Sequence, residues 1–216
     1  NGEYSMDTQI ELRVLELLCS RLCHDLISPV MAVNNGIELL ADDEGGMSAD
    51  IQDLLTLSAG AAAARLQYYR VAYGLGGQSA APIGLPEAGR LTRGLLEDEK
   101  IDLDWPDDAA TAEELSREGM KILLNLVLVG IESLPRGGTL RLMLNGSDII
   151  LTAQGVGAAL REESAAAMAA NADIEALSAR SVQGYFLNYL IGLIGGSTQV
   201  DSNEPDVLRL TVGLPG

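Results

Sequence analysis

Residues 20–30, SRLCHDLISPV, lie within a long helical pattern and contain the only histidine of this 216-residue chain. His24 is followed directly by Asp25, and Ser28 and Pro29 come one turn later. Imidazole is the side chain best suited to accept a phosphoryl group and pass it on near neutral pH. Asp25 can accept a hydrogen bond from one ring nitrogen or carry a proton. The stretch therefore predicts a phosphorylatable histidine rather than an exposed histidine without a role.

The apolar residues around this stretch follow the spacing of an amphipathic helix from about residue 8 to residue 41. We call the stripe that they form the seam; its members are Leu12, Leu15, Cys19, Leu22, Leu26, Val30, Val33, Ile37 and Leu40. Pro29 removes the hydrogen bond to the carbonyl of Asp25 and predicts a bend near His24. Glycines at 45 and 46 end the pattern, and a second helical pattern runs to about residue 73. These patterns predict an antiparallel hairpin. Because a hairpin alone cannot form a full core, we expect a homodimer with a four-helix bundle.

His24 is expected on the face opposite the seam. It lies two residues from both Leu22 and Leu26, about 200° around the helix from each. The neighbours expected on this outer face are Ser20, Arg21, Ile27, Ser28 and Met31. Exposed apolar side chains beside the histidine suit a docking surface for a partner helix, which we assign to Ser20, Ile27 and Met31.

Arginines near the histidine are candidates for binding phosphoryl oxygens. Folding the second helix back on the first places Arg65 near the level of His24. Arg21 or Arg65 would stabilise the phosphoryl group, and Ser28 would support it.

A glycine-rich linker at residues 74–82 separates the hairpin from the rest of the chain. We expect a helical domain at 6–76 and a mixed α/β domain at 83–216. The predicted helices of the second domain are 86–98, 111–133, 160–171 and 183–194. Its predicted strands are 101–105, 139–145, 148–153, 197–202 and 207–213. The fold class is therefore a helical hairpin followed by an α/β sandwich.

Composition excludes several classes of function. The net charge of −17 argues against binding to nucleic acid or to an anionic membrane surface. No apolar stretch reaches transmembrane length, and Cys19 and Cys23 on one helix suit packing better than bridging, so we expect a reduced, cytoplasmic protein. A metal site is not expected, because Cys19, Cys23 and His24 would supply only three ligands.

His24 to Pro29 resembles the H-box of sensor histidine kinases, His-Asp/Glu-x-x-Thr/Asn/Ser-Pro, and the hairpin resembles their dimerisation and phosphotransfer domain. The resemblance implies that His24 carries the phosphoryl group and that Asp25 is its acid/base partner.

Residues 121–140 resemble the N-box region of the kinase ATP-binding domain, with Asn125 as its first asparagine. Val129 stands where the magnesium-binding asparagine belongs, and valine has no oxygen to offer a hard cation. Ala153 replaces the aspartate that reads adenine. Ser181 and Gln183 lie where a phosphate loop needs glycines for close backbone approach. We therefore expect no bound ATP and no other cofactor on this chain.

A phosphotransfer hairpin joined to an ATPase-like domain that lacks its ATP site resembles the ChpT-type histidine phosphotransferases of bacterial cell-cycle phosphorelays over nearly the whole chain. The resemblance implies an enzyme that shuttles phosphoryl groups between the receiver aspartate of a hybrid histidine kinase and those of response regulators. Mg²⁺ would then be held by the partner receiver domain. The alternatives are an ATP-dependent histidine kinase with a divergent ATP site and a non-catalytic scaffold that binds receivers.

Overall fold

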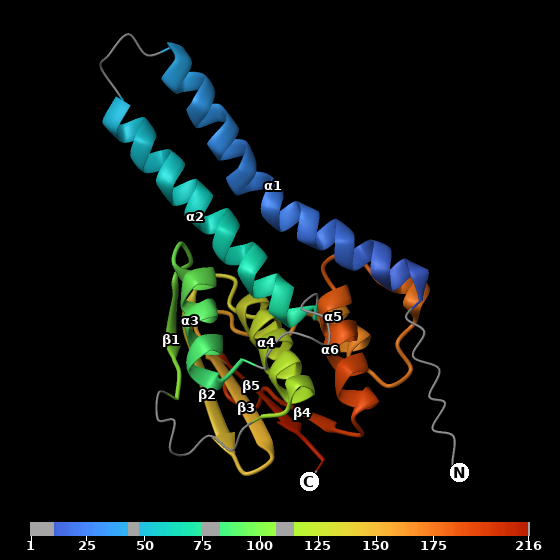
Figure 1. Ribbon diagram of the computed structural model, residues 1–216. Coiled ribbons are helices and arrows are strands. Elements are labelled where there is room, and N and C mark those ends of the chain that lie inside the picture. Colours follow the sequence, from blue (N-terminus) through green and yellow to red (C-terminus); the bar gives the residue numbers. More distant parts are fainter. Residues whose placement is uncertain (1–10, 43–47, 75–82, 107–114, 216) are drawn as a thin grey trace.

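The computed structural model describes residues 11–42, 48–74, 83–106 and 115–215. Two long helices, α1 (Leu12–Asp42) and α2 (Ser48–Ala72), form a hairpin that lies against an α/β body at one end and projects beyond it at the other (Figure 1). The predicted hairpin is confirmed, although the start expected near residue 8 lies outside the described residues. Pro29 is inside α1, and the helix bends midway along its length, as a proline in a helix interior predicts.

The α/β body has two layers, with α3, α4 and α6 on one side of a five-stranded sheet (Figure 1). The sheet order is β1-β2-β3-β5-β4; β1 pairs parallel with β2 and the other pairs are antiparallel. The strands are β1 (Ile101–Asp104), β2 (Gly138–Asn145), β3 (Asp148–Gln154), β4 (Ser197–Asp201) and β5 (Val207–Gly213). The helices are α3 (Leu85–Leu96), α4 (Arg117–Glu132), α5 (Glu162–Ala167), the 3₁₀ turn η1 (Ile174–Ala176) and α6 (Val182–Leu193). The predicted α/β class is thus confirmed.

Two predicted helices differ from those observed. The helix expected at 111–133 begins at Arg117, where the Ser116 side chain accepts a hydrogen bond from the backbone N–H of Gly119, and residues 107–114 lie outside the described part of the chain. The helix expected at 160–171 ends at Ala167. Residues 169–171 are exposed and mostly alanine, so packing does not hold them in a helix. The predicted domain boundary between 76 and 83 also falls outside the described residues.

The main core lies between α4 and the sheet. Leu140 and Leu142 of β2 and Leu151 of β3 alternate inward and are buried against α4. Gly130 allows this close approach, because a Cβ there would collide with the side chains of Leu140 and Leu151. The core therefore fixes the C-terminal end of α4, which is the end that reaches the candidate site.

The N-terminal end of α1 packs on the α/β body through a face that the seam prediction missed. Val14 and Leu18 are buried with Leu177 and Val182, whereas seam residues such as Leu12 are exposed. The seam prediction assumed that only helices cover α1. Because the α/β body covers this end of α1 instead, the buried face is rotated around the helix relative to the predicted seam.

A hydrogen-bonded clamp lies beside this contact. The Arg13 guanidinium donates to the backbone carbonyls of Ile174, Glu175 and Leu177 at 3.0, 3.0 and 3.1 Å. The clamp ties the start of α1 to the segment around η1.

The C-terminal end of α2 belongs to the same core as the sheet. Tyr68 is fully buried, and its hydroxyl donates to the carbonyl of Leu124 on α4 at 2.8 Å. Tyr69 and Ala72 are buried in that core as well. The hairpin and the α/β body are therefore joined by packing as well as by the chain.

Candidate phosphotransfer site

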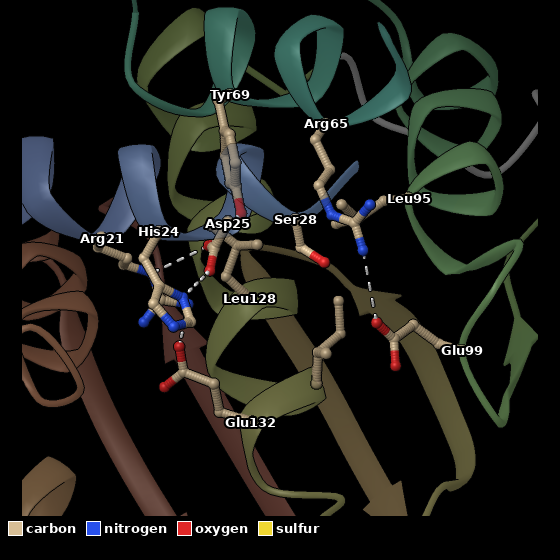
Figure 2. Close-up of a pocket in the computed structure, with 11 residues that line it drawn as sticks. Arg21, His24, Asp25, Ser28, Arg65, Tyr69, Leu95, Glu99, Leu128 and Glu132 are labelled. Atoms are coloured by element: carbon tan, nitrogen blue, oxygen red, sulfur yellow. Dashed lines mark hydrogen bonds and ion pairs between the residues drawn. The ribbon is translucent and has the colours of Figure 1, made fainter. Parts of the chain in front are cut away.

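His24 lies on α1 at the edge of a cavity of about 300 Å³ between the hairpin and the α/β body (Figure 2). Its side chain is 86% exposed. The cavity is lined from α1 by Arg21, His24, Asp25 and Ser28, from α2 by Arg65 and Tyr69, from α3 and the turn after it by Leu95 and Glu99, and from α4 by Leu128, Ile131 and Glu132. The exposed ring can contact a large partner, while α2, α4 and the α3 region surround the α1 side chains next to it.

Asp25 engages one nitrogen of the imidazole. Nδ1 of His24 lies 3.3 Å from Oδ1 of Asp25 (Figure 2). In the tautomer with the proton on Nδ1, the ring donates to this carboxylate oxygen and the lone pair of Nε2 is free. The arrangement suits a nucleophilic imidazole.

Tyr69 holds the other oxygen of Asp25. Its hydroxyl donates to Oδ2 at 2.6 Å. Burial raises the pKa of Tyr69, and the hydrogen bond and charge of Asp25 raise it further. The hydroxyl therefore stays protonated at neutral pH and remains a donor to the carboxylate.

Arg21 lies against α4, not on the outer face where the helical phase had placed it. Its side chain is 13% exposed and pairs with Glu132, and its Nε lies 4.0 Å from Oδ2 of Asp25. Burial opposes the charge of Arg21, but Glu132, Tyr73 and Asp25 outweigh it and raise its pKa. Burial also raises the pKa of Glu132, against the attraction of Arg21. The pair connects the α/β body to the Asp25 carboxylate.

Arg65 and Ser28 line the same cavity as His24, so the register expected for Arg65 is confirmed. Nη2 of Arg65 lies 3.9 Å from Oε1 of Glu99, which is a loose ion pair. Whether Arg21, Arg65 or Ser28 contacts a phosphoryl group stays a prediction.

The residues assigned to partner docking are on the surface. Ser20 is exposed, and Ile27 and Met31 are 61% and 50% exposed on the side of His24 away from Arg21. Their docking role stays a prediction.

The four residues expected to interrupt a kinase-like ATP site are inside the protein. Val129, Ala153, Ser181 and Gln183 are all buried. Gln183 accepts from the Tyr73 hydroxyl at 2.9 Å, and its Nε2 donates to Asn125 Oδ1 at 2.8 Å. Gln183 on α6 thus links the segment directly after α2 to α4.

Among the described residues, no group of His, Cys, Asp and Glu is arranged to hold a metal ion, and no helix is long and apolar enough to cross a membrane. Cys19 and Cys23 are free thiols on the surface of α1.

Tyr69 and Glu132 were missed at the level of sequence. Three of the six tyrosines lie within residues 68–73, in a chain with few aromatic residues, and this cluster was the available signal for Tyr69. Nothing in the sequence pairs Glu132 with Arg21, because their contact depends on how the α/β body docks on α1.

Comparisons with known proteins agree with this geometry. Residues 85–206 match the family described as histidine phosphotransferase C-terminal domain. The protein phosphotransferase ChpT of Brucella abortus (strain 2308) is 34% identical over 210 residues, which cover 94% of this chain and 98% of that protein. A solved structure described as a bacterial phosphotransferase at 1.7 Å superposes with a TM-score of 0.78 at 31% identity and covers 95% of this chain and 98% of that one. The chain therefore belongs to the histidine phosphotransferase family, as a ChpT-type member.

Proposed function

We propose that this phosphotransferase carries phosphoryl groups between receiver domains of a two-component phosphorelay, with His24 as the carrier. The donor is the receiver domain of a hybrid histidine kinase, and the acceptors are response-regulator receivers. The observation that carries the proposal is an 86% exposed imidazole whose Nδ1 lies 3.3 Å from Oδ1 of Asp25. We also assign the relay to bacterial cell-cycle control, and the 34% identity to a protein phosphotransferase ChpT supports this assignment.

The transfer follows from this geometry. Nε2 of His24 attacks the phosphorus of an aspartyl phosphate on the donor; the N–P bond forms as the P–O bond to the aspartate breaks, and the receiver regains its carboxylate. The proton stays on Nδ1, and the ring gains positive charge that Asp25 faces at 3.3 Å. The reverse of this step passes the group to an aspartate of the next receiver. Both links are labile, so transfer runs in either direction.

Positioning of the two partners contributes most to such a transfer. A receiver helix seated on Ser20, Ile27 and Met31 would bring its aspartate in line with Nε2. Arg65 is the better placed arginine for the phosphoryl oxygens, because its contact with Glu99 is loose whereas Arg21 is held by Glu132. Ser28 supports the phosphoryl group from the same helix. The carboxylates of the receiver hold the Mg²⁺, and this chain binds no cofactor.

The exposed seam supports a homodimer. Along α1, seam residues Leu12, Leu15, Val30, Ile37 and Leu40 remain exposed in the single chain, as do Leu54, Leu57 and Leu66 of α2. If two hairpins pack these exposed residues against each other, they form a four-helix bundle on the side of α1 opposite His24. We place the dimer in the cytoplasm, where exposed thiols such as Cys19 and Cys23 remain reduced.

A receiver carrying radiolabelled phosphate tests the proposal, with labelled ATP alone as a parallel reaction. We expect label to move from the receiver to the wild type and not to His24→Ala, with none taken from ATP. Label taken from ATP would identify a kinase, and relay throughput unchanged in His24→Ala would identify a scaffold. Asp25→Ala should slow transfer more than it weakens docking; a pure loss of affinity would contradict its role beside the ring.

A further inference from the structure

The Asp25 carboxylate is held between His24 and a side chain from the other helix of the hairpin. Oδ1 faces Nδ1 of His24, and Oδ2 accepts the short hydrogen bond of Tyr69 (Figure 2). Tyr69 is 4% exposed, so its hydroxyl reaches the carboxylate from inside the protein. The two contacts use different oxygens, and each leaves the other intact.

We propose that Tyr69 is a positioning residue for phosphoryl transfer: it fixes the Asp25 carboxylate so that Asp25 holds the imidazole of His24 in its Nδ1–H tautomer, with Nε2 facing the partner. The inference rests on the proposed role of His24 as the phosphoryl carrier. In this proposal a residue of α2 determines which imidazole nitrogen is reactive, although the histidine itself is on α1.

Helix geometry explains why Asp25 needs such support. Adjacent residues on a helix point about 100° apart and do not face each other. Asp25 therefore reaches the neighbouring ring only in a rotamer that turns its carboxylate toward His24, and the side chain is otherwise free to choose another well. The Tyr69 hydroxyl at Oδ2, with Arg21 Nε 4.0 Å from the same oxygen, selects that rotamer.

Tyr69 is itself held rigidly enough to do this. Its ring stacks on Tyr73 with centroids 5.4 Å apart and planes at 20°, and meets Tyr68 edge-on at 6.3 Å. Tyr68 belongs to α2 and is buried in the core shared with the α/β body, and Tyr73, which directly follows α2, packs against that core. The Tyr69 hydroxyl is thus fixed relative to α1. Through Asp25, this buried group restrains the exposed ring of His24.

Tyr73 supplies a matched control. It lies one turn after Tyr69, directly after the end of α2, and its hydroxyl donates to Gln183 rather than to Asp25. Tyr69→Phe and Tyr73→Phe each remove one hydroxyl and keep the stacked rings. A loss of buried hydrogen bonding alone would affect both variants alike.

The first measurement is the tautomer of the ring, read from ¹H–¹⁵N NMR of the imidazole in the full chain. The chain has one histidine, so the spectrum contains a single set of ring signals. We expect the Nδ1–H tautomer to predominate in the wild type and in Tyr73→Phe, and a redistribution toward the Nε2–H tautomer in Tyr69→Phe. Ring nitrogen shifts in Tyr69→Phe that match those of the wild type would overturn the proposal.

The second measurement is single-turnover transfer from a phosphorylated receiver at saturating concentration. Tyr69→Phe should slow the transfer step about tenfold with receiver affinity unchanged, and Tyr73→Phe should transfer at the wild-type rate. Adding Tyr69→Phe to Asp25→Ala should slow transfer no further, because Tyr69 acts through Asp25. Additive effects, or equal slowing by the two tyrosine variants, would refute the role. If His24→Ala still accepts label, the proposed carrier is wrong, yet the ring tautomer still decides whether Tyr69 positions the imidazole.

Discussion

Asn125 links three helices at the junction between the hairpin and the α/β body. It is fully buried on α4, and its amide nitrogen donates to the carbonyls of Ala72 and Lys121 at 2.7 and 2.8 Å. Its amide oxygen accepts from Gln183 on α6. Replacing Asn125 with alanine removes both ends of this bridge at once.

The expected cost follows from the groups left behind. The Ala72 carbonyl and the Gln183 amide each lose a buried partner, at about 1–3 kcal/mol per group. Loss of the bond to the Lys121 carbonyl costs little, because that carbonyl also takes part in the backbone hydrogen bonds of α4. Alanine is a better helix former than asparagine by up to about 0.7 kcal/mol, which offsets part of the loss. Asn125→Ala should therefore lower the free energy of unfolding by about 1–5 kcal/mol, compared with the about 5–15 kcal/mol typical of a domain.

Urea unfolding measures this change with two signals. Trp105 is the only tryptophan and is buried in the α/β body, so its fluorescence reports that part, while far-UV circular dichroism reports all the helices. Asn34→Ala is the matched control, since Asn34 is exposed on α1 and its side chain donates to Glu38 one turn later on the same helix. The control should change stability by less than about 0.5 kcal/mol. A loss for Asn125→Ala no larger than that of the control would refute the reasoning.

Three further changes test the site and its surfaces. Arg21→Met and Glu132→Met should each cost about 3 kcal/mol by leaving a buried charge unpaired, and the double variant should cost about 1 kcal/mol or less; additive losses in urea unfolding would contradict a coupled pair. Ile37→Asp places a charge in the exposed seam and should raise the dimer dissociation constant more than about tenfold, as measured by light scattering after gel filtration; an unchanged mass at low concentration would move the interface elsewhere. Met31→Asp should weaken receiver binding by about tenfold in calorimetric titration without changing the oligomeric state; equal affinity would place docking on another face.

Helical and strand periodicity predicted most elements because each buries a regular face. The strand expected at 207–213 is observed at Val207–Gly213, and its alternate residues Leu208, Leu210 and Val212 are buried. The alanine-rich segment after α5 has no such face, and there the predicted helix was too long. Regular burial, not local composition, made these elements predictable.

The candidate site was predictable only around His24 itself. Arg21 and Ile27 lie three residues before and after His24, about 60° to either side of it on the helix. Helical phase treats the two positions alike, but the α/β body docks on the Arg21 side, so Arg21 is covered and Ile27 is exposed. The contacts of Asp25 with Tyr69 and of Arg21 with Glu132 follow from the same docking. Tertiary packing chose between two faces that the local pattern leaves equivalent.

The core that α2 shares with the α/β body has a consequence for phosphoryl transfer through the relay. If the α/β body had to move in order to deliver a phosphoryl group to His24, it would have to separate from α2. That movement would expose Tyr68 and break its hydrogen bond to Leu124. Here packing holds the α/β body on α2, so on the proposed function the exposed His24 is open to a partner without any domain movement. Flow through it is then set by mass action, that is, by the amounts and phosphorylation levels of the competing receivers. On the proposed function, the direction of net transfer would therefore reverse when the ratio of phosphorylated donor to phosphorylated acceptor reverses.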